Sequence, residues 1–209
     1  MPDNDSVPTA FACRDWRPAV EALATTGWWR LPQALDAAGW QALRAEAQAL
    51  HGQAAFAPAR IGRAAGAQRE TAVRGDELCW LTPEMPAGRC YLAWMEALRT
   101  ALNRELFLGL DEFEAQYAHY PAGAFYRTHI DRHRDSSARV ISAVLYLNED
   151  WPEAAGGELV MYDAGGGELF RQAPHGGTLL LFRSAGMPHE VLPATRARWS
   201  IAGWFRTRA

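Results

Sequence analysis

The pattern of hydrophobic and polar positions divides the chain near residue 112. Before this point, apolar residues recur at the three-to-four-residue spacing of amphipathic helices in three segments. These segments predict helices over residues 16–27, 35–52 and 89–106, with a short apolar strand over residues 28–32. The first half of the chain is therefore expected to be mainly helical.

From residue 113 onward, short runs rich in Val, Ile, Leu, Tyr and Phe alternate with Gly, Pro and Asp turns. They predict about eight strands, over residues 113–123, 125–131, 139–148, 157–163, 167–173, 177–184, 189–194 and 198–207. Strands at this spacing are typical of a jelly roll. We expect an α+β fold, in which a double-stranded β-helix (residues 113–209) and supporting N-terminal helices (residues 1–112) form one structural unit.

Residues 59–81, between the second and third predicted helices, are rich in Gly and Arg. Hydrophobic alternation on both sides of Arg74-Gly75-Asp76 indicates a β-hairpin. Its glycines favour a flexible segment outside the core. We expect this hairpin to act as a mobile lid.

Composition narrows the class of protein. The 209 residues are 49% hydrophobic and 22% charged, which suits one globular domain, and the net charge of −3 disfavours nucleic-acid binding. No apolar stretch approaches the roughly 18 residues of a membrane span, and the polar N-terminus does not resemble a signal peptide. Three widely spaced cysteines form no disulfide framework. We expect a cytoplasmic monomer with no membrane or nucleic-acid partner.

Candidate metal ligands occur in the second predicted strand. His129 and Asp131 are two residues apart, so strand alternation places them on one face. His189, at the start of the seventh strand, supplies a third ligand. Two imidazoles and one carboxylate on one face of an ion leave octahedral positions open, as in non-haem Fe(II) oxygenases. His133 is a rival ligand by parity, but it lies in a turn-like segment, and ordinary hydrogen-bonded histidines are the alternative interpretation.

Arg198 and Ser200 share one face of the last predicted strand, shortly after His189. A dicarboxylate co-substrate held by a metal at one end needs a partner for its other carboxylate. A guanidinium provides two matched donors for a carboxylate, and a hydroxyl adds a third. Taken alone, an arginine exposed on an edge strand would be the simpler interpretation.

The order H-x-D, a distant His and R-x-S resembles the 2-oxoglutarate/Fe(II)-dependent dioxygenases. "YPAGAFYRTHID", "ARVISAVLYLNEDW", "GGELVMY" and "PHEVLPATRARWSIAGWF" are similar to the prolyl 4-hydroxylases of the oxygen-sensing type and their bacterial relatives, over roughly residues 60–205. The resemblance implies an iron site at His129, Asp131 and His189. It also implies 2-oxoglutarate binding by Arg198, Tyr146, Tyr120 and Ser200, and substrate binding by Arg139, Trp204, Arg74 and Asp76.

The resemblance implies hydroxylation of a prolyl residue in a protein, with elongation factor Tu as the suggested target. Fe(II), 2-oxoglutarate and O₂ are the implied cofactor and co-substrates, and ascorbate is an implied supporting reductant. One alternative is a 2-oxoglutarate oxygenase acting on a free amino acid, another small molecule or an alkylated base. Another is a non-catalytic jelly-roll binding protein, which would have a broken triad or lack the distal arginine.

Overall fold

The computed structural model describes residues 11, 14–59, 72–132 and 138–208. Its helices are α1 (Arg17–Thr25), α2 (Ala37–Gly52), α3 (Pro86–Leu106) and the short 3₁₀ helix η3 (Glu153–Ala155). Its strands are β1 (Trp28–Leu31), β2 (Ala57–Pro58), β3 (Glu77–Trp80), β4 (Glu112–Tyr120), β5 (Tyr126–His129), β6 (Arg139–Tyr146), β7 (Leu159–Tyr162), β8 (Glu168–Gln172), β9 (Leu179–Arg183), β10 (His189–Val191) and β11 (Arg198–Arg206).

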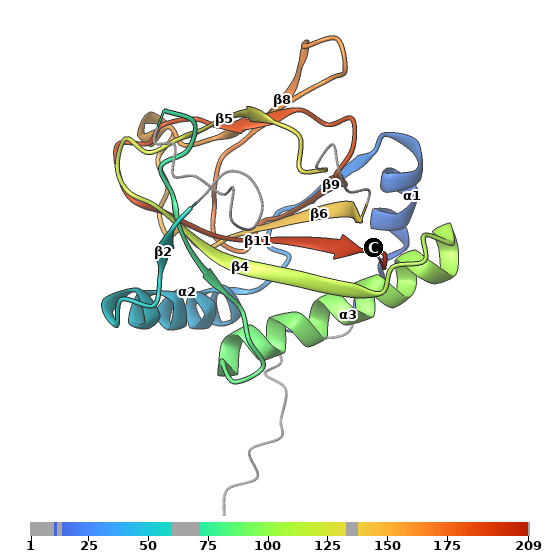
Figure 1. Ribbon diagram of the computed structural model, residues 1–209, viewed down its shortest axis with the longest axis horizontal. Helices are drawn as coiled ribbons and strands as arrows, with labels where there is room; N and C mark the ends of the chain where they lie inside the picture. Colours follow the sequence, from blue (N-terminus) through green and yellow to red (C-terminus); the bar gives the residue numbers. More distant parts are fainter. Residues whose placement is uncertain (1–10, 12–13, 60–71, 133–137, 209) are drawn as a thin grey trace, which may run out of the picture.

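Two antiparallel sheets form the jelly roll (Figure 1). The larger has the order β1-β9-β6-β11-β4-β3-β2, and the smaller has the order β5-β10-β7-β8. The eight strands from β4 to β11 match the eight runs predicted from the sequence, so the predicted fold class is confirmed.

Strands from the first half of the chain extend the larger sheet. β1 pairs with β9, and β3 pairs with both β2 and β4. The predicted division after residue 112 falls at the start of β4, so the two predicted segments share this one sheet.

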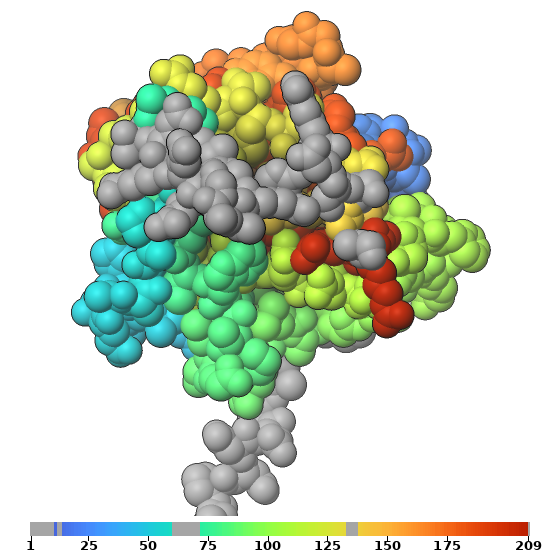
Figure 2. All heavy atoms as spheres, viewed as in Figure 1, coloured from blue at the N-terminus to red at the C-terminus, as the bar shows by residue number. Residues whose placement is uncertain are grey.

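The larger sheet has one face toward the helices and the other toward the smaller sheet. Along β11, Trp199, Ile201 and Phe205 join the hydrophobic core that includes α1, α2 and α3. Arg198 and Trp204 lie on the opposite face, because strand side chains alternate. Figures 1 and 2 show α2 and α3 along one side of the molecule, with the turn between β7 and β8 projecting on the opposite side.

Glu46 of α2 fixes α3 against the sheet. Its carboxylate accepts hydrogen bonds from the backbone N–H groups of Ala87 and Gly88, both at 2.8 Å, in the first turn of α3. It also accepts a hydrogen bond from the Tyr117 hydroxyl at 2.6 Å. A carboxylate at a helix N-terminus satisfies free N–H groups and interacts favourably with the helix dipole. One side chain therefore connects α2, α3 and β4.

The sequence predicted that the hairpin around Arg74-Gly75-Asp76 would lie outside the core, but these three residues are packed into the fold. Asp76 is buried, and the Gly75 N–H donates to the Phe125 carbonyl at 3.0 Å. β3 pairs with β2, which precedes the predicted hairpin segment, and residues 60–71 lie outside the described residues. The Arg74–Asp76 ion pair neutralises both charges, which allows this polar segment to pack.

Within the described ranges, no helix is long and apolar enough to cross a membrane.

Candidate active site

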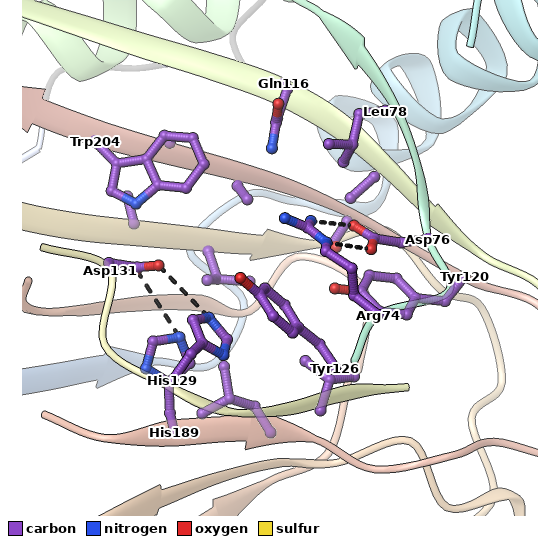
Figure 3. A pocket seen from close by; sticks show the side chains of 18 of the residues that line it. Arg74, Asp76, Leu78, Gln116, Tyr120, Tyr126, His129, Asp131, His189 and Trp204 are labelled. Carbon is purple, nitrogen blue, oxygen red and sulfur yellow. Dashed lines mark hydrogen bonds and ion pairs between the residues drawn. The ribbon is translucent and has the colours of Figure 1, made fainter. Parts of the chain in front are cut away.

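A cavity of about 280 Å³ lies between the two sheets (Figure 3). It is lined by all but one of the residues predicted for the site: His129, Asp131, His189, Arg198, Ser200, Tyr120, Arg139, Trp204, Arg74 and Asp76. The exception is Tyr146, which is fully buried beside Arg198. Folding thus brings together residues that are far apart in the sequence.

The three predicted metal ligands converge at one end of this cavity. His129 of β5 and His189 of β10 are direct partners in the antiparallel register. Their Nε2 atoms lie 3.6 Å and 3.8 Å from the two carboxylate oxygens of Asp131. All three ligand atoms lie within 4.8 Å of one another, a spacing that fits three ligands of one ion.

Backbone carbonyls fix the orientation of both imidazoles. His129 Nδ1 pairs with the Arg127 carbonyl at 2.8 Å, and His189 Nδ1 pairs with the Met187 carbonyl at 3.1 Å. A carbonyl only accepts, so each Nδ1 carries a proton, and it is the Nε2 atom of each ring that is directed toward the cluster. Both Nε2 atoms face Asp131, so the three potential ligand atoms converge on one point (Figure 3).

The sequence predicted that strand alternation would direct Asp131 toward the site, but the structure positions this side chain by other contacts. β5 ends at His129, so Asp131 lies in the bend that follows and is not held by strand alternation. Instead, Ser142 of β6 donates a hydrogen bond to Asp131 Oδ2 at 2.7 Å, and Ser184 pairs with Ser142 at 2.9 Å. Sequence reasoning missed both serines, although hydroxyl groups within or next to apolar strands are a recognisable signal.

The protonation states of the cluster suit metal binding. Burial lowers the pKa of His189 to about 4, which leaves this imidazole neutral at pH 7. Burial alone would raise the pKa of Asp131, but the neighbouring His189 and His129 and the Ser142 hydrogen bond lower it overall. An ionised carboxylate and neutral imidazoles are the forms that coordinate a cation.

Arg198 is a buried cation with no counter-charge in the described part of the chain. It is 2% exposed; its Nε has no partner, and its Nη1 donates only to Ser200 Oγ at a long 3.5 Å. Its guanidinium lies 5.0 Å from the Tyr120 ring and 5.1 Å from the Tyr146 ring. Burying an unpaired charge is costly, so this arrangement fits an anionic ligand.

Tyr146 adds a second unpaired polar group beside Arg198. Among the described residues its buried hydroxyl has no hydrogen-bond partner, and burial raises its pKa to about 12. The hydroxyl therefore keeps its proton at neutral pH and can donate to a carboxylate. Arg198 and Tyr146 together therefore offer several hydrogen-bond donors to a carboxylate ligand.

Arg139 and Trp204 form another part of the cavity lining. The Arg139 guanidinium lies 3.6 Å from the centroid of the Trp204 ring and pairs with Glu114 at 3.1 Å. Trp80, which is half exposed, lies beside Trp204. This part of the lining combines aromatic surface with a held positive charge, which suits contact with a peptide.

Arg74 and Asp76 line the same cavity (Figure 3). Two hydrogen bonds of 2.7 Å and 2.6 Å join them. The Arg74 guanidinium also lies over the Tyr126 ring at 4.2 Å. Both side chains are thus held by neighbours in the cavity wall, at the base of the hairpin that the sequence predicts to be a mobile lid.

Tyr126 is a site residue that sequence reasoning missed. Its ring stacks on His129 with centroids 3.6 Å apart and an interplanar angle of 14°. Strand alternation would place residues three positions apart on opposite faces. A β-bulge in β5, where His189 and Val191 of β10 pair with His129 and Tyr126, brings the two residues onto the same face, and no sequence pattern signalled it. The rival ligand His133 lies outside the described residues.

Comparisons with known proteins agree with the family resemblance found in the sequence. Residues 115–206 match the model of the 2OG-Fe(II) oxygenase superfamily. The crystal structure of a prolyl-4-hydroxylase from Pseudomonas putida is 43% identical, with a TM-score of 0.83, and the match covers 93% of this chain and 100% of that chain.

Two further matches are more distant. A prolyl hydroxylase from Trichoplax adhaerens, solved with a hypoxia inducible factor oxygen degradation domain peptide fragment, is 24% identical with a TM-score of 0.81, covering 94% of both chains. Egl nine homolog 1 from Homo sapiens is 29% identical over 64% of this chain. The match spans only 33% of that human protein, about a third of its length.

Proposed function

Because the chain belongs to the prolyl hydroxylases of the 2OG-Fe(II) oxygenase superfamily, we propose that it hydroxylates a prolyl residue in a protein substrate. Enzymes of this superfamily use Fe(II), 2-oxoglutarate and O₂. The observation that carries the proposal is the presence, in one cavity, of a His/Asp/His cluster and a buried arginine that has no counter-charge among the described residues.

His129, Asp131 and His189 would hold the iron. Arg198, with Ser200, Tyr146 and Tyr120 around it, would bind 2-oxoglutarate. With O₂ as the oxidant, the bound iron and 2-oxoglutarate would supply the oxidising chemistry: one oxygen atom would enter succinate as 2-oxoglutarate loses CO₂, and the other would enter a substrate C–H bond. The protein itself fixes the ligands, neutralises the co-substrate and excludes water from the buried end of the cavity.

The substrate would enter past Arg139 and Trp204, with Arg74 and Asp76 in the wall of the same cavity. The half-exposed Trp80 and the exposed Ile130 add apolar surface among these lining residues. Such a surface supports binding of a peptide segment around the target proline. Elongation factor Tu is the first candidate substrate, suggested by the resemblance to bacterial prolyl hydroxylases. We further propose that the enzyme acts as a cytoplasmic monomer.

Mass spectrometry of elongation factor Tu tests this proposal. The protein would be incubated with Fe(II), 2-oxoglutarate, ascorbate and air, and the expected result is a gain of one oxygen atom on a proline. Omission of 2-oxoglutarate and the His129→Ala variant are the controls, and both should abolish the gain. Succinate formation without modified elongation factor Tu would retain the oxygenase but overturn this substrate. Absence of both products would overturn the proposed function.

A further inference from the structure

A second cluster of potential metal ligands lies outside the cavity. His51 is in the last turn of α2, Glu77 begins β3, and His119 lies in β4. Glu77 Oε2 lies 2.9 Å from His51 Nε2 and 3.1 Å from His119 Nδ1. Three separate elements thus direct two imidazoles at a single carboxylate oxygen.

This cluster is on the helix side of the larger sheet. Asp76 and Tyr120 line the cavity, whereas the adjacent residues Glu77 and His119 are direct cross-strand partners in the second cluster. Side chains at consecutive strand positions project to opposite faces. The two clusters therefore occupy opposite faces of the same sheet and share no residue.

Aromatic packing holds the two imidazoles in place. Trp199 stacks on His119 with ring centroids 4.2 Å apart and an interplanar angle of 29°. Trp199 and Phe56 contact His51 edge-on at 5.5 Å and 5.2 Å. Ligands whose orientation is fixed by packing lose little freedom when they bind an ion.

The donor set and its spacing suit a transition-metal ion. Ligand atoms about 2.1 Å from a tetrahedral ion lie roughly 3.4 Å apart. Glu77 Oε2 now lies 2.9 Å and 3.1 Å from the two imidazole nitrogens, so small outward movements of these side chains would make room for a metal ion. Each imidazole would move its proton to the other ring nitrogen or release it. The His51 and Glu77 side chains are 37% and 36% exposed, so solvent can provide an entry path and a fourth ligand.

Charge at the cluster also favours a cation. Hydrogen bonds from His51 and His119 lower the pKa of Glu77, so its carboxylate is ionised at neutral pH. Burial lowers the pKa of His119, despite the opposing effect of Glu77, so this imidazole is neutral. Glu77 is therefore already in its ligand form, and the neutral His119 needs only to move its Nδ1 proton to Nε2.

We propose that His51, Glu77 and His119 form a second metal site, separate from the proposed iron site, that binds a divalent transition-metal ion of the Zn²⁺ class. The ion connects the end of α2 to β3 and β4. Since β3 follows directly from Asp76 in the cavity wall, the bound ion braces the base of the hairpin from the opposite face of the sheet (Figure 1).

Zinc binding by a protein without the first site tests the proposal. The full-length Asp131→Ala variant removes the carboxylate of the cavity cluster and is equilibrated with Zn²⁺ by dialysis, with bound metal counted by elemental analysis. One zinc ion per chain is expected. Adding Glu77→Gln should weaken zinc binding by more than about 100-fold. Loss of a residue that only supports a ligand costs roughly 10- to 100-fold in metal affinity, and loss of the ligand itself should cost more.

His175→Gln in the Asp131→Ala background is the matched control, since His175 is exposed and belongs to neither cluster. It should leave zinc binding unchanged. Equal zinc affinity with and without Glu77→Gln would overturn the proposal, as would absence of zinc from the Asp131→Ala protein. If circular dichroism shows that Glu77→Gln does not fold, His51→Gln at the half-exposed end of α2 replaces it, with the same expectations.

Anomalous diffraction from wild-type crystals soaked in Zn²⁺ provides a second readout. A peak between His51, Glu77 and His119, above the zinc edge and absent below it, is expected. A peak at the cavity cluster without one here would overturn the proposal. Neither readout uses hydroxylase activity, so this site and the proposed function succeed or fail separately.

Discussion

His129 and His189 face each other directly across the β5–β10 pair, and their ring centroids lie 4.2 Å apart. Each donates its Nδ1 proton to a carbonyl two residues earlier in its own chain segment. The same local geometry on two antiparallel strands therefore directs both Nε2 atoms toward Asp131. The metal site depends on strand register as much as on the identities of its ligands.

Replacement of His129 by Ala should reduce succinate formation by more than about 100-fold while leaving the fold intact, because one of three proposed iron ligands is lost. The rate is measured with saturating 2-oxoglutarate, and circular dichroism checks folding. His175→Ala is the control and should retain the wild-type rate. A wild-type rate in the His129→Ala protein would show that the triad assignment is wrong.

Ser142→Ala should weaken Fe(II) binding by about 10- to 100-fold, because Asp131 loses the hydroxyl that orients its carboxylate. Activity titrated against Fe(II) should show a higher half-saturating concentration, with much of the maximal rate recovered at high iron. Ser184→Ala, which affects Asp131 only through Ser142, should have a smaller effect. An unchanged iron titration would contradict a positioning role for Ser142.

Arg198→Met should raise the stability of the ligand-free protein and weaken the binding of 2-oxoglutarate. Removing this cation, which has no counter-charge among the described residues, should stabilise the ligand-free protein by about 1 kcal/mol or more, because a buried unpaired charge is lost. It should weaken 2-oxoglutarate binding by roughly 30-fold or more, the cost of losing one partner of a buried charge pair. Thermal unfolding with and without 2-oxoglutarate and Mn²⁺ measures both effects.

Arg198→Lys is the matched variant for this prediction. It keeps the charge but loses the paired donors of the guanidinium, so it should lose affinity without gaining stability. A marked drop in the ligand-free melting temperature of Arg198→Met would instead show that Arg198 mainly stabilises the fold.

Arg139→Ala should raise the KM for the protein substrate by roughly 5- to 30-fold, because the cavity lining loses both this side chain and the cation–π contact, worth about 1–2 kcal/mol, that holds the Trp204 ring in place. The KM for 2-oxoglutarate should change much less, because Arg139 lies beside Trp204 and not beside Arg198. Arg171→Ala, on the exposed strand β8, is the control. Equal changes in both KM values would argue against a substrate-binding role.

Glu46→Ala should lower the free energy of unfolding by about 2–3 kcal/mol, since two N–H groups of α3 and the Tyr117 hydroxyl lose a charged acceptor. Glu46→Gln keeps one acceptor oxygen and should cost less. Urea denaturation measures both, with the exposed Glu21→Ala as a control expected within about 0.5 kcal/mol of wild type. Equal stability of the Glu46→Ala and Glu21→Ala proteins would refute this role for Glu46.

The order of elements was readable from the sequence because hydrophobic periodicity is a local property. The alternation along residues 198–207 predicted that Arg198 and Ser200 share a face, and both line the cavity, whereas Trp199 between them packs in the helix-facing core. The same rule failed at Asp131, because β5 ends two residues too early and a serine from β6 positions the carboxylate.

The sequence by itself determined the series of strands, the three candidate iron ligands and the candidate arginine for binding a co-substrate. Tertiary structure alone decided what each of these groups touches. It placed Tyr126 on His129, left Arg198 without a counter-charge among the described residues, and brought His51, Glu77 and His119 together on the far side of the sheet. Such contacts depend on strand register and on helix docking, which are set by the packing of the whole core and leave no periodic signal in any one segment.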